Sequence, residues 1–308
     1  HLNASIVAQR ASGNDASALM DQRQSLVDRV AEIVPVREVA REHDQISLYT
    51  TGGAILLEGN PAQIGFSPVG VITADMTLSS GALSGLTING MAVPSGDDGV
   101  LGGGTLGAMF AIRDALAPEA QTAFDALARD MIERFADPTV DPTLTPGQPG
   151  LFTDRGAAFD PLIEAGLAGR LTLNAAADPK QGGQIWRLRD GLGAPAPGNV
   201  GDATLLSALA GALQSARIPG SGNFSGAARS ASGLAADVLS QVAGARQQAD
   251  VRRSYTVARQ EAMTELQLAD GVDTDAELQT LLLIEQAYSA NARVVQTIDD
   301  LIQTLIGL

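Results

Sequence analysis

Residues 273–308 carry the most regular alternation of apolar and polar positions in the chain. Thr274 and Glu277 are spaced as a capping box, which predicts a helix that begins at Thr274. Apolar residues then recur in steps of three and four, with Asn291 in the one polar place of this seam. The seam is Leu281, Ile284, Tyr288, Val295, Ile298, Ile302 and Leu305, and a second stripe beside it is Ala287, Val294, Leu301 and Leu308. The apolar face is wider than a two-stranded coiled coil requires, so we expect two or more neighbouring helices.

Two interpretations of this helix remain open from periodicity alone. Most amphipathic stripes pack on the core of their own domain. The helix stands last in the sequence, with no later segment to cover its other side, which favours an assembly element. The expected assembly interface is Leu281, Ile284, Tyr288, Val295, Ile298, Leu301, Ile302 and Leu305.

Three further long helices are predicted, at Ala16–Val34, Leu106–Ala136 and Phe224–Leu268, and a shorter one at Thr204–Gln214. The apolar face of the first consists of Leu19, Leu26, Val30 and Ile33. The seam of the third consists of Ala228, Ala231, Ala235, Val238, Val242, Ala245 and Ala249. No such narrow seam is buried by one helix alone, so we expect the three long helices to pack side by side as a rod.

From Val36 to Val100 the period changes to two, which indicates short strands. Asn89-Gly90 between two apolar runs is a strong hairpin signal. Leu171–Asn174 and Gln184–Leu188 are further strand candidates. The expected fold class is α+β, an elongated helical rod with inserted small antiparallel β lobes. The expected domains are a rod of residues 1–35, 101–136 and 222–272, a β lobe at 36–100, a loop-rich α/β lobe at 137–221 and a terminal assembly helix at 273–308.

Composition narrows the possible functions. The chain has 308 residues, 45% of them hydrophobic, which suits about two folded domains. A net charge of -15 argues against a nucleic-acid partner, because phosphate binding needs clustered cations. The absence of cysteine excludes disulfides and thiolate chemistry. No apolar run reaches transmembrane length, and we expect no membrane partner.

The segment Gly102–Gly107 satisfies the G-x-G-x-x-G pattern, which raises the hypothesis of a nucleotide-binding enzyme. A dinucleotide site also needs a buried parallel strand before the glycines and an acid at the end of the next strand. Here Asp97 and Asp98 precede the glycines, and the downstream Asp125 falls inside a predicted helix. A flexible loop that leads into a helix is the better interpretation.

Other candidate residues also favour structural roles. Asp21 and Arg23 suit a catalytic acid and an anion clamp, but at a helix face they more often form ion pairs that fix packing. Asp137, Asp141 and Asp154 lack the spacing of a calcium loop, which favours solvated turns.

The lone Trp186 is expected to be a core anchor. His43 is the one internal histidine, and no nucleophile has a plausible base, so no catalytic residue, cofactor or metal is expected.

Several motifs resemble those of bacterial flagellar axial proteins, in particular the family of hook-associated protein 1, the hook–filament junction protein. The C-terminal matches are Gly271-Val272-Asp273, Leu281-Leu282, Gln286-Ala287-Tyr288, Ala292-Arg293-Val294 and the apolar end Leu301 to Leu308. The matches nearer the start are Leu19-Met20-Asp21-Gln22-Arg23, Gly103 to Gly107, Arg113-Asp114 and Phe124 to Ala128, where Phe124 replaces the family's usual Leu. The family's N-terminal helix has no counterpart, so we expect an upstream segment to be missing.

The resemblance implies a structural subunit and no enzyme. It implies that the protein joins hook to filament after export by the flagellar type III apparatus, without a cleaved signal peptide, and works outside the cell. The implied partners are the hook subunit, the second junction protein, copies of the same chain in a ring and an export chaperone. A hook or filament subunit remains an alternative, since the C-terminal motifs are shared among axial proteins.

Overall fold

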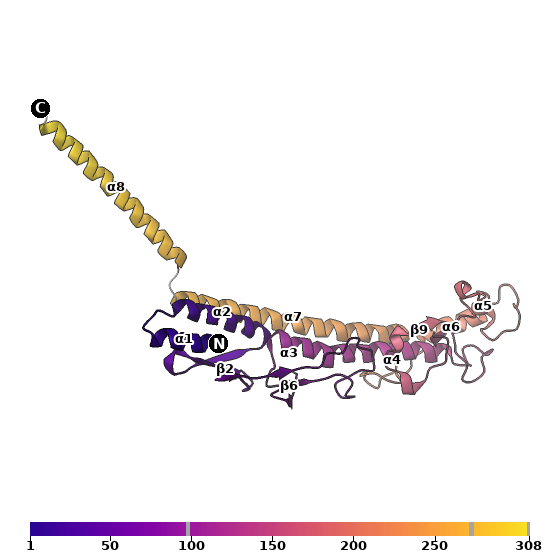
Figure 1. The fold of residues 1–308 in the computed structure, drawn as a ribbon. Helices are drawn as coiled ribbons and strands as arrows, with labels where there is room; N and C mark the ends of the chain where they lie inside the picture. The colour runs from indigo at the N-terminus through magenta and orange to yellow at the C-terminus, as the bar shows by residue number, and fades with distance from the viewer. Residues whose placement is uncertain (97–98, 271–273, 307–308) are drawn as a thin grey trace. The chain divides into compact units, whose positions relative to one another are not determined.

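The computed structural model describes the backbone of residues 1–96, 99–270 and 274–306, and the side chains of residues 1–96, 99–266, 278–293 and 296. The chain divides into two compact units, His1–Ser240 and Gln241–Leu308, which are described separately. Long helices alternate with small antiparallel sheets (Figure 1), which confirms the α+β class.

The first unit begins with two helices, α1 (Leu2–Ala11) and α2 (Ser17–Ile33), which pack together. Just before α2, Oδ1 of Asp15 accepts a hydrogen bond from the backbone N of Ser17, the first residue of the helix, at 3.0 Å. α2 confirms the helix predicted at Ala16–Val34, but its buried residue is Val27. Val27 packs on Ile46 and Leu48 of the first sheet. Of the predicted apolar face, Leu26, Val30 and Ile33 are exposed instead.

Two antiparallel sheets follow. The first has the order β1 (Val36–Ala40), β2 (Ile46–Thr50), β3 (Ile55–Glu58) and β4 (Asn60–Pro61), with the 3₁₀ turn η1 (Glu42–Asp44) between β1 and β2. The second has the order β5 (Ile64–Gly65), β6 (Leu86–Ile88) and β7 (Met91–Val93). Asn89 and Gly90 both have positive φ, 50° and 80°, which confirms the predicted hairpin and fits a type I′ turn.

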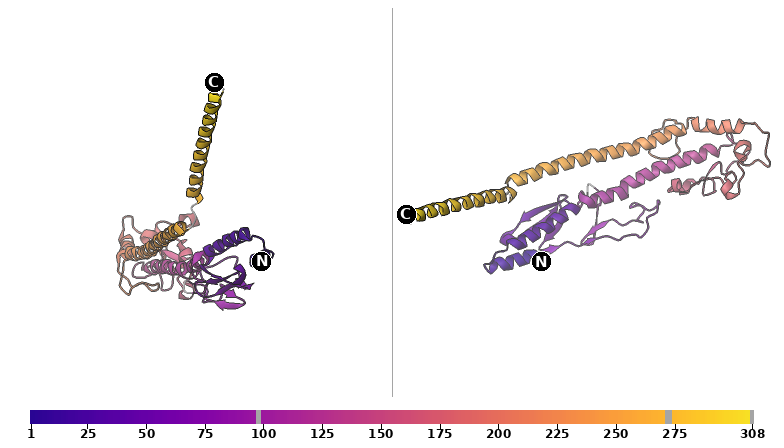
Figure 2. Two further views of the ribbon diagram at one scale, coloured as in Figure 1. Left: turned by 90° about the vertical axis from the view of Figure 1, so that its left-hand side faces the viewer. Right: turned by 90° about the horizontal axis from the view of Figure 1, so that it is seen from above.

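The helix predicted at Leu106–Ala136 is confirmed as a continuous run of α3 (Gly104–Ala111), the π-helical segment η2 (Ile112–Leu116) and α4 (Ala117–Phe135) (Figure 2). At one end, Phe110 joins Val34, Leu86, Ile88 and Leu101 in a core between α2, α3 and the second sheet. At the other end, Ala128 and Ile132 of α4 pack on Leu167. This helical run therefore links the β region to the following lobe.

That lobe contains a two-stranded sheet and short helices. They are β8 (Phe152–Asp154), η3 (Pro161–Ile163), η4 (Leu167–Gly169), β9 (Leu171–Leu173), η5 (Pro179–Gln181), α5 (Arg187–Asp190) and α6 (Thr204–Gln214). The strand at Leu171–Asn174 and the helix at Thr204–Gln214 are thus confirmed, the former one residue shorter.

Two predictions for this lobe are wrong. Gln184–Leu188 is a turn that leads into α5, because Arg187 donates to the carbonyls of Leu192 and Ala194 and folds the chain back. Trp186 is only half-buried and lies under the guanidinium of Arg187, 4.8 Å from the ring centroid. The buried cluster nearby is formed by Leu144, Ala177 and Leu192 instead.

The last two helices are α7 (Ala231–Asp270) and α8 (Thr274–Ile306). α7 begins seven residues later than predicted, because Arg217 and Arg229 form an antiparallel bridge just before it. Its first turns belong to the first unit, where Ala231, Leu234 and Val238 are buried and Ala235 of the predicted seam is exposed. α8 begins at the predicted Thr274, although the side chains of the capping box, Thr274 and Glu277, lie outside the described residues.

Candidate assembly site

The described side chains of α8 present an apolar surface. Leu281, Ile284 and Tyr288 of the predicted seam are 62%, 63% and 78% exposed. Leu278, Leu282 and Leu283 are exposed as well. Between Leu278 and Arg293 the only charged residues are Glu285 and Arg293 itself. Fully burying each large side chain is worth about 1.5–3 kcal/mol, so a partner for this face would be strongly favoured.

The other residues of the predicted interface are Val295, Ile298, Leu301, Ile302 and Leu305, and their side chains lie outside the described residues. Their backbone belongs to α8, so the helical spacing on which the seam depends is present. The interface itself stays a prediction.

The start of α7 is tied to the lobe by a buried arginine at the end of α4. Arg134 is among the most buried large side chains, and its Nε donates to Oδ2 of Asp130 at 2.5 Å. Its other nitrogens donate to the carbonyls of Ala212 at 2.7 Å, Ser215 at 2.6 Å and Arg229 at 2.8 Å. One side chain thus connects α4, the end of α6 and the segment that leads into α7. The four-residue spacing of Asp130 and Arg134 could have indicated the ion pair, but the carbonyl partners are distant in sequence.

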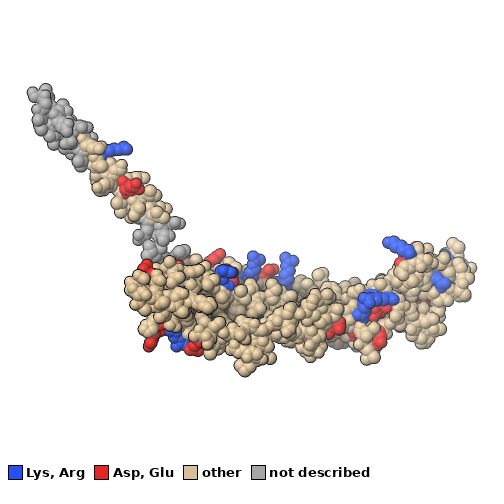
Figure 3. Space-filling model, in the orientation of Figure 1, with Lys and Arg blue, Asp and Glu red and all other residues tan. Residues whose placement is uncertain are grey.

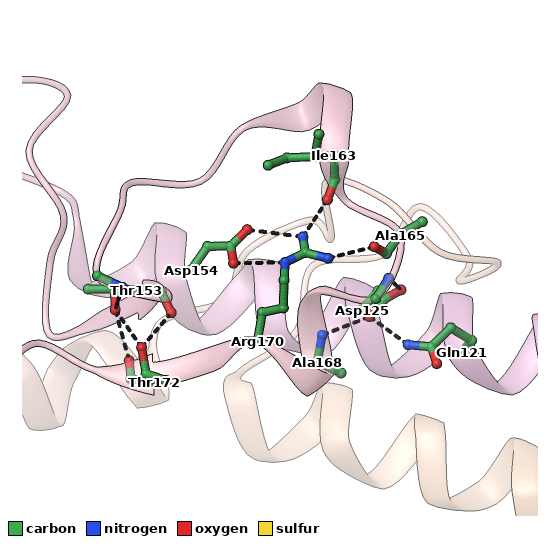
Figure 4. Close-up of polar contacts among 11 residues, drawn as sticks. Gln121, Asp125, Thr153, Asp154, Ile163, Ala165, Ala168, Arg170 and Thr172 are labelled. Atoms are coloured by element: carbon green, nitrogen blue, oxygen red, sulfur yellow. Dashed lines mark hydrogen bonds and ion pairs between the residues drawn. The ribbon is translucent and has the colours of Figure 1, made fainter. Parts of the chain in front are cut away.

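Asp125 and Arg170 organise the turns around η4 (Figure 4). Asp125 accepts from the backbone N of Gly166 and of Ala168, both at 2.7 Å. Arg170 donates to both carboxylate oxygens of Asp154, at 2.8 and 3.0 Å, and to the carbonyls of Ile163 and Ala165. The hydrogen bond with Asp154 raises the pKa of Arg170. Asp125 therefore binds backbone amides, and Arg170 binds backbone carbonyls and the carboxylate of Asp154. These hydrogen bonds stabilise the turns around η4.

The aspartates considered for calcium also act in turns. Oδ1 of Asp137 accepts from the N and Oγ1 of Thr139, and these bonds lower the pKa of Asp137. Asp141 accepts in the same way from Thr143, and its Oδ2 accepts from the N of Leu192 at 2.9 Å. Asp141 and Asp154 are buried, so the expectation of solvated turns is wrong for them. Within the described residues, no group of three acidic, histidine or cysteine side chains is placed to hold a metal ion.

Two glycines of the Gly102–Gly107 segment, Gly103 and Gly104, are explained by close packing. Gly103 and Gly104 have positive φ, 85° and 61°. A Cβ on Gly104 would lie 2.4 Å from the carbonyl oxygen of Ile33, and one on Gly103 would lie 2.8 Å from the ring of Pro35. The hydroxyl of Thr105 donates to the carbonyl of Glu32. The turn that begins α3 is therefore seated against the C-terminal end of α2.

Arg23 fixes packing, as expected, but the groups that it binds are an amide side chain and a backbone carbonyl, where an ion pair was expected. It donates to Oδ1 of Asn3 at 3.1 Å and to the carbonyl of Asp44 at 2.6 Å. The carboxylate of Asp44 forms an ion pair with Arg10. Asp21 is exposed on α2. Beside Arg23, a groove of about 430 Å³ is lined by α1, α2 and the first sheet, with Leu26 and Val30 on its wall.

An exposed apolar helix, turns stabilised by carboxylates and a continuous helical run from α3 to α4 are features of a structural protein. Residues 1–140 match the family described as the flagellar hook-associated protein FlgK helical domain. Residues 269–308 match the family described as the flagellar basal body rod FlgEFG protein C-terminal. These two matches identify the chain as a flagellar hook-associated axial protein of the FlgK type. Curated proteins gave no match.

The second match covers α8 and the residues just before it. The first match covers α1 to α4 with the first and second β sheets. Both agree with the resemblance found from the motifs, and they place the protein in the flagellum. Among the described helices, none is both long and apolar enough to cross a bilayer.

Proposed function

We propose that this protein is the structural subunit that joins the flagellar hook to the filament, and that it assembles through α8. The observation that carries the proposal is the exposed apolar face of α8, which coincides with the region that matches axial C-terminal domains. Leu281, Ile284 and Tyr288 supply the described part of the interface, and Val295, Ile298, Leu301, Ile302 and Leu305 supply the rest. Neighbouring helices that cover this face provide the free energy of assembly.

The partners in this proposal are the hook subunit, the second junction protein and copies of the same chain in a ring, with an export chaperone before assembly. The protein is exported without a cleaved signal peptide and acts outside the cell, without enzymatic activity. A nucleotide-binding enzyme is disfavoured, since Gly103 and Gly104 are occupied in packing against α2.

The domain division that we propose is the one expected from the sequence. A helical rod of residues 1–35, 101–136 and 222–272 carries the β lobe at 36–100 and the loop-rich lobe at 137–221. Residues 273–308 form the assembly helix. The exposed apolar residues of α2 and the groove beside them supply a surface that helix packing within the rod would cover.

The test is a strain whose own copy of the gene is deleted and replaced by the variant Leu281→Asp/Ile284→Asp. Two carboxylates on the apolar face prevent close helix packing, so we expect the variant to be exported into the medium while cells lose filaments and motility. The matched control is Gln279→Asp/Gln286→Asp, which adds the same charge at exposed polar positions of the same helix and leaves motility intact.

Two further measurements make the outcome decisive. Thermal melting of the purified full chain should change little in the first variant, because α8 lies outside the first unit. Normal filaments on cells with Leu281→Asp/Ile284→Asp would refute the role of α8. Loss of the hook in a deletion strain, with no filament released into the medium, would favour the alternative of a hook subunit.

A further inference from the structure

Charge is distributed very unevenly over the β region of the first unit. The first sheet and its turns carry Arg37, Glu38, Arg41 and Glu58, among other charges. Between Glu58 and Asp97, by contrast, the only charged residue is Asp75. The chain as a whole has 18% charged residues, so a segment of this length with one charge is a marked exception. We call residues 59–96 the charge-poor lobe.

The charge-poor lobe also exposes large apolar side chains. Val71 is 75% and Ile72 is 55% exposed, and they follow each other at the turn of a long excursion between β5 and β6. Ile64, Phe66, Val69, Leu78 and Met91 are exposed in the same lobe. In Figure 3 the surface around β6 shows no lysine, arginine, aspartate or glutamate. A large apolar surface without charge is typical of an interaction site.

The backbone beneath these side chains is anchored on both sides. The ring of Phe66 lies edge-on to that of Phe110 in α3, with centroids 5.8 Å apart, and the guanidinium of Arg113 lies over both rings. The hydroxyl of Ser84 donates to the carbonyl of Ser67 at 2.6 Å. The segment that presents the apolar surface is therefore held in place by ring contacts and a hydrogen bond.

The outer strands of the two sheets also differ in charge and in proline content. The outer strand of the first sheet, β1, carries Arg37 and Glu38, and its other outer strand, β4, ends in Pro61. Charges and proline at an edge oppose pairing with another chain. β7, an outer strand of the second sheet, is Met91–Val93 and carries neither. Within the charge-poor lobe, the outer strand β7 thus contains no charged residue and no proline.

We propose that the charge-poor lobe is a contact surface for a second copy of this chain. Two copies with a net charge of -15 repel each other, and they approach at least electrostatic cost where the surface carries the fewest charges. A basic partner would be matched by acidic residues, which this lobe supplies only at Asp75. The proposal rests on the function proposed above, in which copies lie side by side, and it adds a lateral contact separate from α8.

The test uses a unique thiol, since the natural chain has no cysteine. Val71→Cys is labelled with a benzophenone maleimide and irradiated in the full chain, in a background of Leu281→Asp/Ile284→Asp so that α8 does not contribute. The expected product has about twice the 31.6 kDa mass of the chain and contains no other protein. The control is Val200→Cys, a valine that is 95% exposed in a loop outside the lobe, which should give no such product.

A second measurement follows self-association by sedimentation in the same background. Val71→Asp/Ile72→Asp should weaken the association at least tenfold, whereas Leu162→Asp/Val200→Asp, at two highly exposed positions elsewhere, should not. Added salt should strengthen the association of the parent chain, because it screens the repulsion between acidic copies. Equal cross-linking from residues 71 and 200, or self-association unaffected by the two lobe charges, would overturn the proposal. Because α8 is inactivated throughout, such a failure would leave the hook–filament function untouched.

Discussion

Replacement of Arg134 by alanine tests whether the buried arginine holds the start of α7 on the lobe. The side chain is 1% exposed and that of its partner Asp130 is 3% exposed. Arg134→Ala leaves the Asp130 carboxylate buried without its cation, and breaking a buried pair in this way costs about 3–5 kcal/mol. It also removes the donor from the carbonyls of Ala212, Ser215 and Arg229. We therefore expect the free energy of unfolding of the first unit to fall by about 4 kcal/mol.

The assay is urea denaturation of the full chain followed by circular dichroism. With a slope of about 2 kcal/mol/M, the expected loss lowers the midpoint of the first unit by about 2 M. The matched control is Arg246→Ala. Arg246 and Asp250 form an ion pair of 3.9 Å with side chains 85% and 65% exposed, so this change should cost under about 0.5 kcal/mol.

A double-mutant cycle separates the ion pair from the carbonyl contacts. Arg134→Ala and Asp130→Ala together should cost less than the sum of the two single changes by at least about 1 kcal/mol, because the double variant buries no unpaired charge. If Arg134→Ala lowered the midpoint no more than Arg246→Ala does, the buried arginine would not hold the lobe and the start of α7 together.

Two further predictions concern the first unit. Gly104→Ala should destabilise it by at least about 2 kcal/mol in urea, because the new Cβ would lie 2.4 Å from the Ile33 carbonyl oxygen at a φ of 61°. Gly53→Ala, also at positive φ but with nothing within 4 Å, should cost only about 1 kcal/mol, and an equal loss at both positions would contradict the packing argument. The lowered pKa of Asp137 predicts a stability contribution that is present above the ordinary Asp pKa of about 3.9 and is lost as the pH falls through the folded-state value. The melting temperature of Asp137→Asn should therefore drop less than that of the parent chain between pH 5 and about pH 3, and parallel curves would refute the link.

Local features of the fold followed directly from the sequence. The helix at Thr204–Gln214, the start of α8 at Thr274 and the hairpin at Asn89-Gly90 were all found at the expected positions. Each depends on residues that are neighbours in sequence: a helical period, a capping residue, or a turn pair that tolerates positive φ. The pattern also placed Leu281, Ile284 and Tyr288 on one side of α8, and these described side chains are exposed.

The direction of burial was decided by tertiary structure. On α2 the period indicated Leu26, Val30 and Ile33, yet α1 and the first sheet cover the side that carries Val27. Periodicity marks a broad stripe on a helix, and only the neighbouring elements determine which edge of that stripe is buried.

The roles of the acidic and basic residues were likewise decided in three dimensions. Asp141 and Asp154 resemble surface turn residues in sequence, but Asp141 binds the amide of Leu192 and Asp154 binds Arg170. Arg134 binds carbonyls about eighty or more residues further along the chain. A carboxylate or guanidinium is buried only where distant backbone groups supply its hydrogen bonds, and no pattern of neighbouring residues records that supply. The sequence thus determined the long helices, the hairpin turn and the shared face of Leu281, Ile284 and Tyr288 on α8, while tertiary structure decided which charges are buried between these elements.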